Sequence, residues 1–82
     1  MDDLVFPGHA LEQMRKDGLT KHDVYAVVSD SDEKIERTDG RTLYGRLLDD
    51  ARYVVVVIED DARSVVSAWQ AKRRSRTRSR RR

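Results

Sequence analysis

The chain of 82 residues contains no cysteine, so a disulfide framework and a thiolate metal site are both excluded. It has one proline and few aromatic residues, and its longest apolar run, residues 54–58, is too short to span a bilayer. The N-terminus begins Met-Asp-Asp and lacks the basic and then apolar order of a signal peptide. We therefore expect a soluble, cytoplasmic protein that has no membrane partner.

Acidic residues are absent from positions 72–82, which read KRRSRTRSRRR. This segment holds eight of the 17 Lys and Arg residues and none of the 15 Asp and Glu residues, so residues 1–71 keep nine basic and 15 acidic side chains, a net charge of −6. A run of like charges without apolar residues cannot bury surface, and we expect a disordered tail.

A polyanion is the natural partner of this tail, with RNA as the first candidate and an acidic protein as the second. A purely solubilising role, or contact with the acidic body of the chain, is the alternative. The tail residues predicted to bind nucleic acid are Lys72, Arg73, Arg74, Arg76, Arg78, Arg80, Arg81 and Arg82.

Residues 1–71 are sufficient for a single small domain, which begins with two expected helices. The first spans residues 7–17, because Pro7 suits a first helical turn, apolar residues recur at spacings of three and four, and Gly18 follows. The second spans residues 20–28, where Thr and Asp stand three positions apart in the manner of a capping box.

From residue 34 onward the apolar period changes to two, which predicts strands over residues 34–38, 41–48, 52–59 and 63–70. Asp39-Gly40 predicts a hairpin with a type I′ turn, in which both central residues have positive φ. The third strand is apolar on both faces and should be central. The prediction is an α+β fold: two N-terminal helices packed on one face of a four-stranded antiparallel meander sheet, whose other face needs a partner, a ligand or a groove.

The two histidines, His9 and His22, each stand in the first turn of an expected helix. Histidine is the commonest general acid or base near neutral pH, although a surface or capping position is the alternative, above all for His22. These histidines and the scattered carboxylates show no metal-ligand spacing, so we expect neither a metal nor a cofactor.

Further candidates lie on the second and fourth strands. Tyr44 and Arg46 share a face and are residue types that hold a phosphate, while Gly45 between them predicts a bulge or a close backbone approach. Ser67 and Trp69 share a face of the last strand. Trp69 either stacks on a base or closes the core beside the first helix.

Three stretches of this chain resemble a known family. The opening FPGHALEQMRKDGLTKHDVYAVV, the Tyr-Gly-Arg at 44–46 and the closing VVSAWQAKRR are similar to a small bacterial domain of unknown function that opens with His-Ala. The closing segment is also similar to the end of BrnT toxins, and both groups are thought to belong with RelE- and ParE-type toxins. The resemblance covers residues 6–74.

The resemblance implies a RelE- or BrnT-like toxin of a toxin–antitoxin system, acting as a metal-independent ribonuclease and paired with an antitoxin protein. In such a reaction a base removes the 2′-OH proton and a cation stabilises the charge on the phosphoryl oxygens. The resemblance implies His9 as acid or base, Arg46 as phosphate stabiliser, and Tyr44 and Ser67 as residues that orient the substrate.

This chain departs from the family pattern at three positions. Gln13 and Asp17 stand where the family has arginines, and Trp69 stands where BrnT toxins have one, although Arg15 is close by and is a candidate for nucleic-acid binding. The rival hypothesis is therefore a non-catalytic binding module whose Arg-rich tail contacts nucleic acid or an acidic protein.

Overall fold

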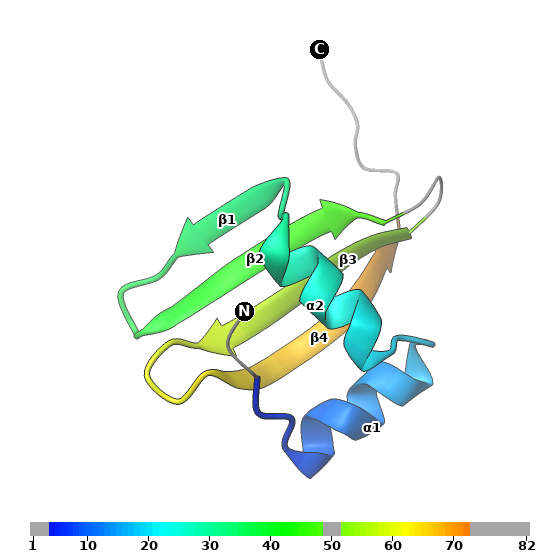
Figure 1. The fold of residues 1–82 in the computed structure, drawn as a ribbon, viewed down its shortest axis with the longest axis horizontal. Helices are drawn as coiled ribbons and strands as arrows, with labels where there is room; N and C mark the ends of the chain where they lie inside the picture. Colours follow the sequence, from blue (N-terminus) through cyan, green and yellow to red (C-terminus); the bar gives the residue numbers. More distant parts are fainter. Residues whose placement is uncertain (1–3, 49–51, 73–82) are drawn as a thin grey trace.

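A computed structural model of the chain describes residues 4–48 and 52–72, except for the side chain of residue 72. Two helices are followed by four strands: α1 (Gly8–Lys16), α2 (Lys21–Ser29), β1 (Glu33–Glu36), β2 (Arg41–Leu47), β3 (Arg52–Glu59) and β4 (Ser64–Lys72). The strands form one antiparallel sheet in the order β1-β2-β3-β4 (Figure 1). The predicted α+β fold, with two N-terminal helices and an antiparallel meander, is confirmed.

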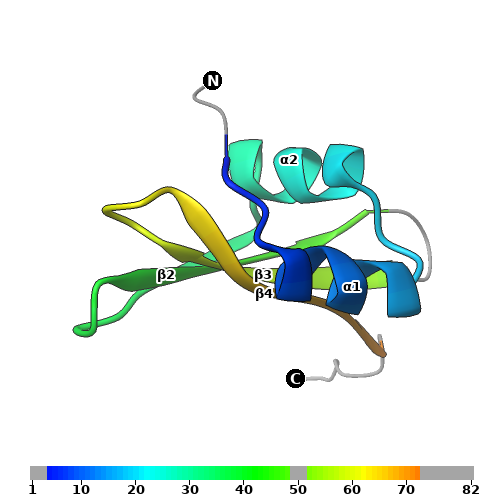
Figure 2. The same cartoon turned by 90° about the horizontal axis from the view of Figure 1, so that it is seen from below.

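α2 lies over one face of the sheet, and α1 lies beside the sheet at the level of β3 and β4 (Figure 2). α2 crosses β2 and β3, whereas α1 runs along β4 at one margin of the sheet. The core fills the space between the helices and the sheet, and its buried members are Leu4, Ala10, Met14, Leu19, Val24, Val27, Val54, Val56, Ile58, Val65 and Ala68. Neither helix is long and apolar enough to cross a membrane, within the residues that the structure describes.

The starts of the two helices differ. The capping box of α2 is present as predicted, since Asp23 N donates to Thr20 Oγ1 (3.1 Å) and Thr20 N donates to Asp23 Oδ2 (3.0 Å). α1 has no side-chain cap, and Pro7 is its N-cap rather than a residue of its first turn. Gly18 follows α1 with φ of 73°, in the left-handed conformation expected after a helix end.

The hairpin between β1 and β2 differs from the prediction. Arg37 N donates to Arg41 O (2.8 Å), which closes a loop of residues 38–40 instead of a two-residue turn. Gly40 has φ of 85°, but Asp39 does not have a positive φ, so the predicted type I′ turn is wrong. A three-residue loop needs one left-handed residue, which Gly40 supplies, and β1 therefore ends at Glu36 rather than at residue 38.

β4 begins one residue later and ends two residues later than predicted. Arg63, with φ of 53°, belongs to the turn after β3, so the strand starts at Ser64. Lys72, which the sequence assigned to the tail, is the last residue of the strand and pairs with Arg52 of β3. Backbone pairing thus continues into the basic segment, because the ladder depends on β3 and not on the charge of the side chains.

Polar side chains of α1 cover the outer edge of β4. Gln13 Oε1 accepts a hydrogen bond from Ala68 N (3.4 Å), and Asp17 Oδ2 accepts one from Gln70 N (3.0 Å). Four residues of a helix rise about 6 Å and two residues of a strand about 6.8 Å, so side chains one turn apart match alternate N–H groups of the strand. The arrangement satisfies an edge that would otherwise be free to pair with another chain.

Gly45 lies beneath the ring of Tyr53 on the side of the sheet away from the helices. A Cβ at Gly45 would stand 2.9 Å from Tyr53 Cζ, and the Tyr53 hydroxyl donates to Glu33 Oε1 on β1 (2.6 Å). The close approach predicted at Gly45 is therefore made by a side chain rather than by backbone. The predicted bulge is not at Gly45; the register shift lies between Val57 and Ile58, where β3 pairs with β4.

We expect the substitution Gly45→Val to lower the free energy of unfolding by about 1–3 kcal/mol, because the new side chain displaces the Tyr53 ring. Urea denaturation followed by circular dichroism measures the change. Gly8→Ala is the matched control, since a Cβ there meets no atom within 4 Å, and it should change stability by less than about 0.5 kcal/mol. Equal effects of the two substitutions would contradict the steric role of Gly45.

Candidate functional site

The last turn of α1 lies beside the segment of β4 that leads into the basic tail. The hydrogen bond from Gln70 N to Asp17 Oδ2 fixes this contact. Arg15 and Lys16 occupy that last turn and are exposed. Gln70 lies two residues before the end of β4, so the end of α1 lies beside the last residues of this strand, and we call this part of the molecule, made of Arg15, Lys16 and Lys72, the tail end.

Most of the residues predicted to bind nucleic acid lie outside the described part of the chain. Lys72 ends β4, and only its backbone is described. The predicted residues beyond the described part are Arg73, Arg74, Arg76, Arg78, Arg80, Arg81 and Arg82. The structure shows where these residues are attached to the domain, which is at Lys72, the last residue of β4.

Trp69 lies on the side of the sheet opposite the helices. It pairs with Val55 of β3, whereas Ala68 next to it belongs to the core beneath the helices. The interpretation that Trp69 closes the core beside α1 is therefore wrong, because strand alternation turns its ring to the other face. The ring is partly exposed, and its stacking on a base stays a prediction.

His9 is exposed in the first turn of α1. It lines an open hollow whose other described lining residues are Glu12, Gln13, Lys16 and Asp17. The hollow thus combines two carboxylates with one amine, which is unfavourable for a phosphate group. Gln13 is one helical turn after His9 on α1, and its Oε1 accepts a hydrogen bond from the hydroxyl of Ser67 on β4 (2.9 Å).

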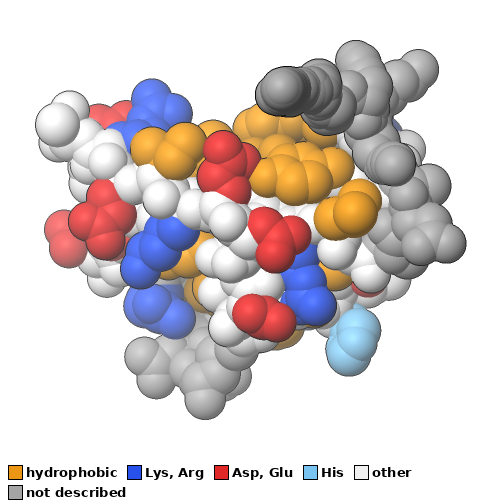
Figure 3. Space-filling view, turned by 90° about the horizontal axis from the view of Figure 1, so that it is seen from above, with side chains coloured by type: hydrophobic (Ala, Val, Ile, Leu, Met, Phe, Trp, Pro, Cys, Tyr) orange, Lys and Arg blue, Asp and Glu red, His pale blue; other side chains and the backbone are white. Residues whose placement is uncertain are grey.

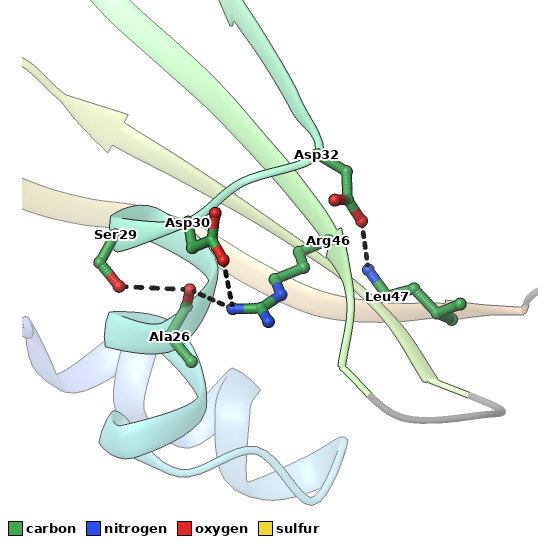
Figure 4. A network of polar contacts seen from close by, with 6 residues as sticks. All are labelled: Ala26, Ser29, Asp30, Asp32, Arg46 and Leu47. Carbon is green, nitrogen blue, oxygen red and sulfur yellow. Dashed lines mark hydrogen bonds and ion pairs between the residues drawn. The ribbon is translucent and has the colours of Figure 1, made fainter.

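Arg46 is engaged with the C-terminus of α2 (Figure 4). Its Nη1 donates to Ala26 O (3.2 Å) and lies 3.7 Å from Asp30 Oδ2. The same carbonyl accepts from Asp30 N (3.3 Å) and from Ser29 Oγ (3.4 Å). A cation at a helix C-terminus satisfies free carbonyls and opposes the negative end of the helix dipole, so this contact makes Arg46 a cap of α2.

Tyr44 shares the helix-side face of β2 with Arg46 and packs against the core. Lys34 of β1 lies over its ring, 5.9 Å from the centroid. Because β3 separates β2 from β4, Tyr44 and Arg46 are about 9–10 Å in the sheet from the strand that carries Ser67. The four predicted catalytic residues therefore form two pairs: Tyr44 with Arg46 under α2, and His9 with Ser67 beside α1.

Polar contacts of Tyr53, Gln13 and Asp17 were not anticipated from the sequence. Burial, together with the hydrogen bond to Glu33, raises the pKa of the Tyr53 phenol above its ordinary value. In the sequence, Gln13 and Asp17 stand out only as departures from the family arginines. In the structure, their side chains accept hydrogen bonds from backbone N–H groups at the outer edge of β4. Their spacing of four residues predicts that both side chains lie on one face of the helix, but the strand that this face contacts could not be known without the fold.

The described residues offer no metal site. Across residues 4–48 and 52–72, no group of three or more His, Cys, Asp or Glu side chains is placed to hold a metal ion.

Comparison with protein-family models, with curated proteins and with solved structures found no match to this chain. The relationship to RelE, ParE and BrnT toxins thus stays a prediction from short motifs. The functional interpretation depends on the geometry and the charge of the chain itself.

We expect Arg46→Ala to lower the free energy of unfolding by about 1–2 kcal/mol, because Ala26 O and Asp30 lose their cation. Thermal and urea unfolding measure this. Arg37→Ala is the control: its ion pair with Asp39 (3.5 Å) is exposed on both sides, so its loss should cost less than about 0.5 kcal/mol. An Arg46→Ala protein as stable as the parent would show that the cap contributes nothing.

Proposed function

We propose that the chain is a non-catalytic module that binds nucleic acid, with RNA as the first candidate, through its Arg-rich segment. The observation that carries this proposal is the separation of charge: residues 72–82 hold eight basic residues and no acidic one. Arginine forms bidentate, charge-assisted hydrogen bonds with phosphate oxygens and does so without reading base sequence. Binding should therefore be strong at low salt and largely independent of sequence.

The placement of the basic segment supports this proposal. The segment leaves the sheet at the tail end, where Arg15 and Lys16 add two exposed cations. The carboxylate of the adjoining Asp17 is already occupied by Gln70 N (3.0 Å). We expect Arg15 to add a phosphate contact to those of the segment, whereas Lys16 also lines the hollow that contains the carboxylates of Glu12 and Asp17.

The geometry of the predicted catalytic residues gives less support to a ribonuclease. Phosphoryl transfer of this kind needs an acid or base and a cation converging on one phosphate. Arg46 is bonded to α2, the Ser67 hydroxyl is bonded to Gln13, and β3 lies between their strands. These contacts have a structural purpose, which favours binding over catalysis.

Deletion of residues 73–82 removes seven arginines and should abolish most of the RNA affinity. Fluorescence anisotropy with a labelled single-stranded RNA, measured over a series of salt concentrations, tests this. If every arginine meets a phosphate, the slope of log K against log salt should become shallower by up to about 5 on deletion. A deleted protein that keeps the affinity and the slope of the full chain would refute the proposal.

Single substitutions test the contribution of the tail end. Arg15→Ala should weaken RNA binding by a small factor and make the salt slope slightly shallower, because one phosphate contact is lost. Arg37→Ala is the control, since Arg37 lies in the β1–β2 hairpin and is paired with Asp39. Equal losses from both substitutions would mean that net charge alone acts, without a site at the tail end.

The ribonuclease that the resemblance implies has its own test. Full-length protein, His9→Ala and His22→Ala are expressed in a bacterial host, and total RNA is examined on a gel together with growth. The binding module predicts intact RNA in all three cultures. Cleavage and growth arrest that vanish in His9→Ala, but persist in His22→Ala, would replace our proposal with the toxin ribonuclease.

A further inference from the structure

The side of the sheet away from the helices carries a continuous set of apolar side chains. Strand alternation and the register of the sheet place them together. We call this set the open face; its members are Ile35, Leu43, Leu47, Tyr53, Val55, Val57 and Trp69. In the space-filling view, hydrophobic side chains gather along the upper margin of the molecule, on the side away from the helices (Figure 3).

No described helix covers the open face, because α2 packs on the other side and α1 lies along the edge of β4 (Figure 2). Ile35 on the edge strand β1 and Leu47 at the end of β2 are 48% and 41% exposed, so both aliphatic side chains are open to solvent. Val55 and Val57 are only 8% and 7% exposed, since their neighbours in the sheet shield them. The centre of the face is therefore close-packed, and its most exposed apolar side chains lie toward β1 and the end of β2.

The margin of the open face is acidic. Glu33 and Glu59 lie on this side of the sheet, and the exposed Asp61 lies in the turn after β3. Asp60 is not part of this margin, because its carboxylate accepts a hydrogen bond from Thr42 on the helix side (2.8 Å). Arg41, which pairs with Glu59, offsets only part of this charge. A negative margin repels phosphate groups, so the open face is a poor surface for nucleic acid and is suited to an apolar partner that brings positive charge.

We propose that the open face binds a second copy of this chain. A second copy offers the same apolar face and also the segment 72–82, whose eight positive charges complement the acidic margin. Packing through one face generates a closed, isologous dimer with no surface left over for further growth. Stacked sheets lie about 10 Å apart, and ten extended residues reach about 33 Å, so residues 73–82 of one copy can reach the margin of the other.

The face is small for a stable protein–protein interface. Four strands at about 4.8 Å and eight residues at about 3.4 Å give a face of about 500 Å² per copy. Stable interfaces bury about 800 Å² on each partner, so this dimer should dissociate at micromolar concentrations. A dimer of this strength is detected by dilution rather than by its persistence on a column.

Trp69 reports on the interface directly, because it is the only tryptophan of the chain and lies on the open face. Sedimentation equilibrium of the nuclease-treated full chain over a range of micromolar concentrations should show a monomer–dimer equilibrium. Trp69 emission should shift to shorter wavelength over the same range, as water is removed from the ring. A protein that stays monomeric, with constant emission at all concentrations, would overturn the proposal.

Leu47→Glu and Ile35→Glu should each weaken the dimer at least about tenfold, because a carboxylate would be buried in the interface. Both side chains are exposed in the single chain, so the fold should tolerate the changes, which circular dichroism verifies. Leu11→Glu is the matched control, since Leu11 is 38% exposed but lies on α1. A dimer that is unaffected by the two open-face variants, or equally weakened by the control, would overturn the proposed surface.

The dimer and the nucleic-acid proposal can fail separately. RNA binding is measured on the chain that lacks residues 73–82, and dimerisation on the variants of the open face. The truncated chain should still dimerise, but more weakly and with less dependence on salt, because it loses the charge contact. Dimerisation by the truncated chain as tight as that of the full chain would refute the charge complementarity with the acidic margin.

Discussion

The burial of β3 is the constraint on which the rest of the molecule depends. Val54, Val56 and Ile58 are almost completely buried beneath the helices, and Val55 and Val57 are nearly as buried on the other face. A strand that is apolar on both faces has to lie between two other strands, and β2 and β4 occupy those places. The position of every candidate functional residue then follows from its strand and from the face on which alternation places it.

Polar side chains serve this arrangement, and one of them, Arg46, belongs to the predicted catalytic set. Arg46 holds the C-terminus of α2 to β2, while Gln13 and Asp17 hold α1 to the edge of β4. Each contact joins a helix to a strand through a hydrogen bond to backbone, worth about 0.5–1.5 kcal/mol or more where a charge takes part. Side chains that fix helices on a sheet are not free to bind a phosphate, so the chain is better understood through its surfaces.

The edges and the faces of this small sheet are covered to different extents. One edge is covered by α1, the other edge is the short β1, whose four residues are all exposed, and one face has no helix over it. Two short helices cannot cover both faces of four strands, so the second face keeps its apolar side chains in contact with solvent unless another molecule covers them. The basic segment that begins at the end of β4 adds a charged surface to this apolar face. Trp69 of the open face and Lys72 of the basic segment both belong to β4, so this strand connects the two surfaces.

The sequence by itself determined the types of the elements, their order and the meander. Helical spacing, the capping box at Thr20 and Gly18 after α1 are short-range signals, and each depends on residues within one turn. The centrality of β3 was also readable, because two apolar faces require two neighbours. The concentration of arginine after β4 is a property of composition and needs no fold to be recognised.

Tertiary structure decided the contacts between residues far apart in the chain. The cap formed by Arg46, the side of the sheet on which Trp69 lies, and the passage of the Tyr53 ring over Gly45 depend on register and on the placement of the helices. Even the Asp39-Gly40 turn followed the local pairing of Arg37 with Arg41 rather than the dipeptide alone. Local propensity fixes elements within a few residues, whereas the partner of a side chain across the sheet is set by the packing of the whole domain.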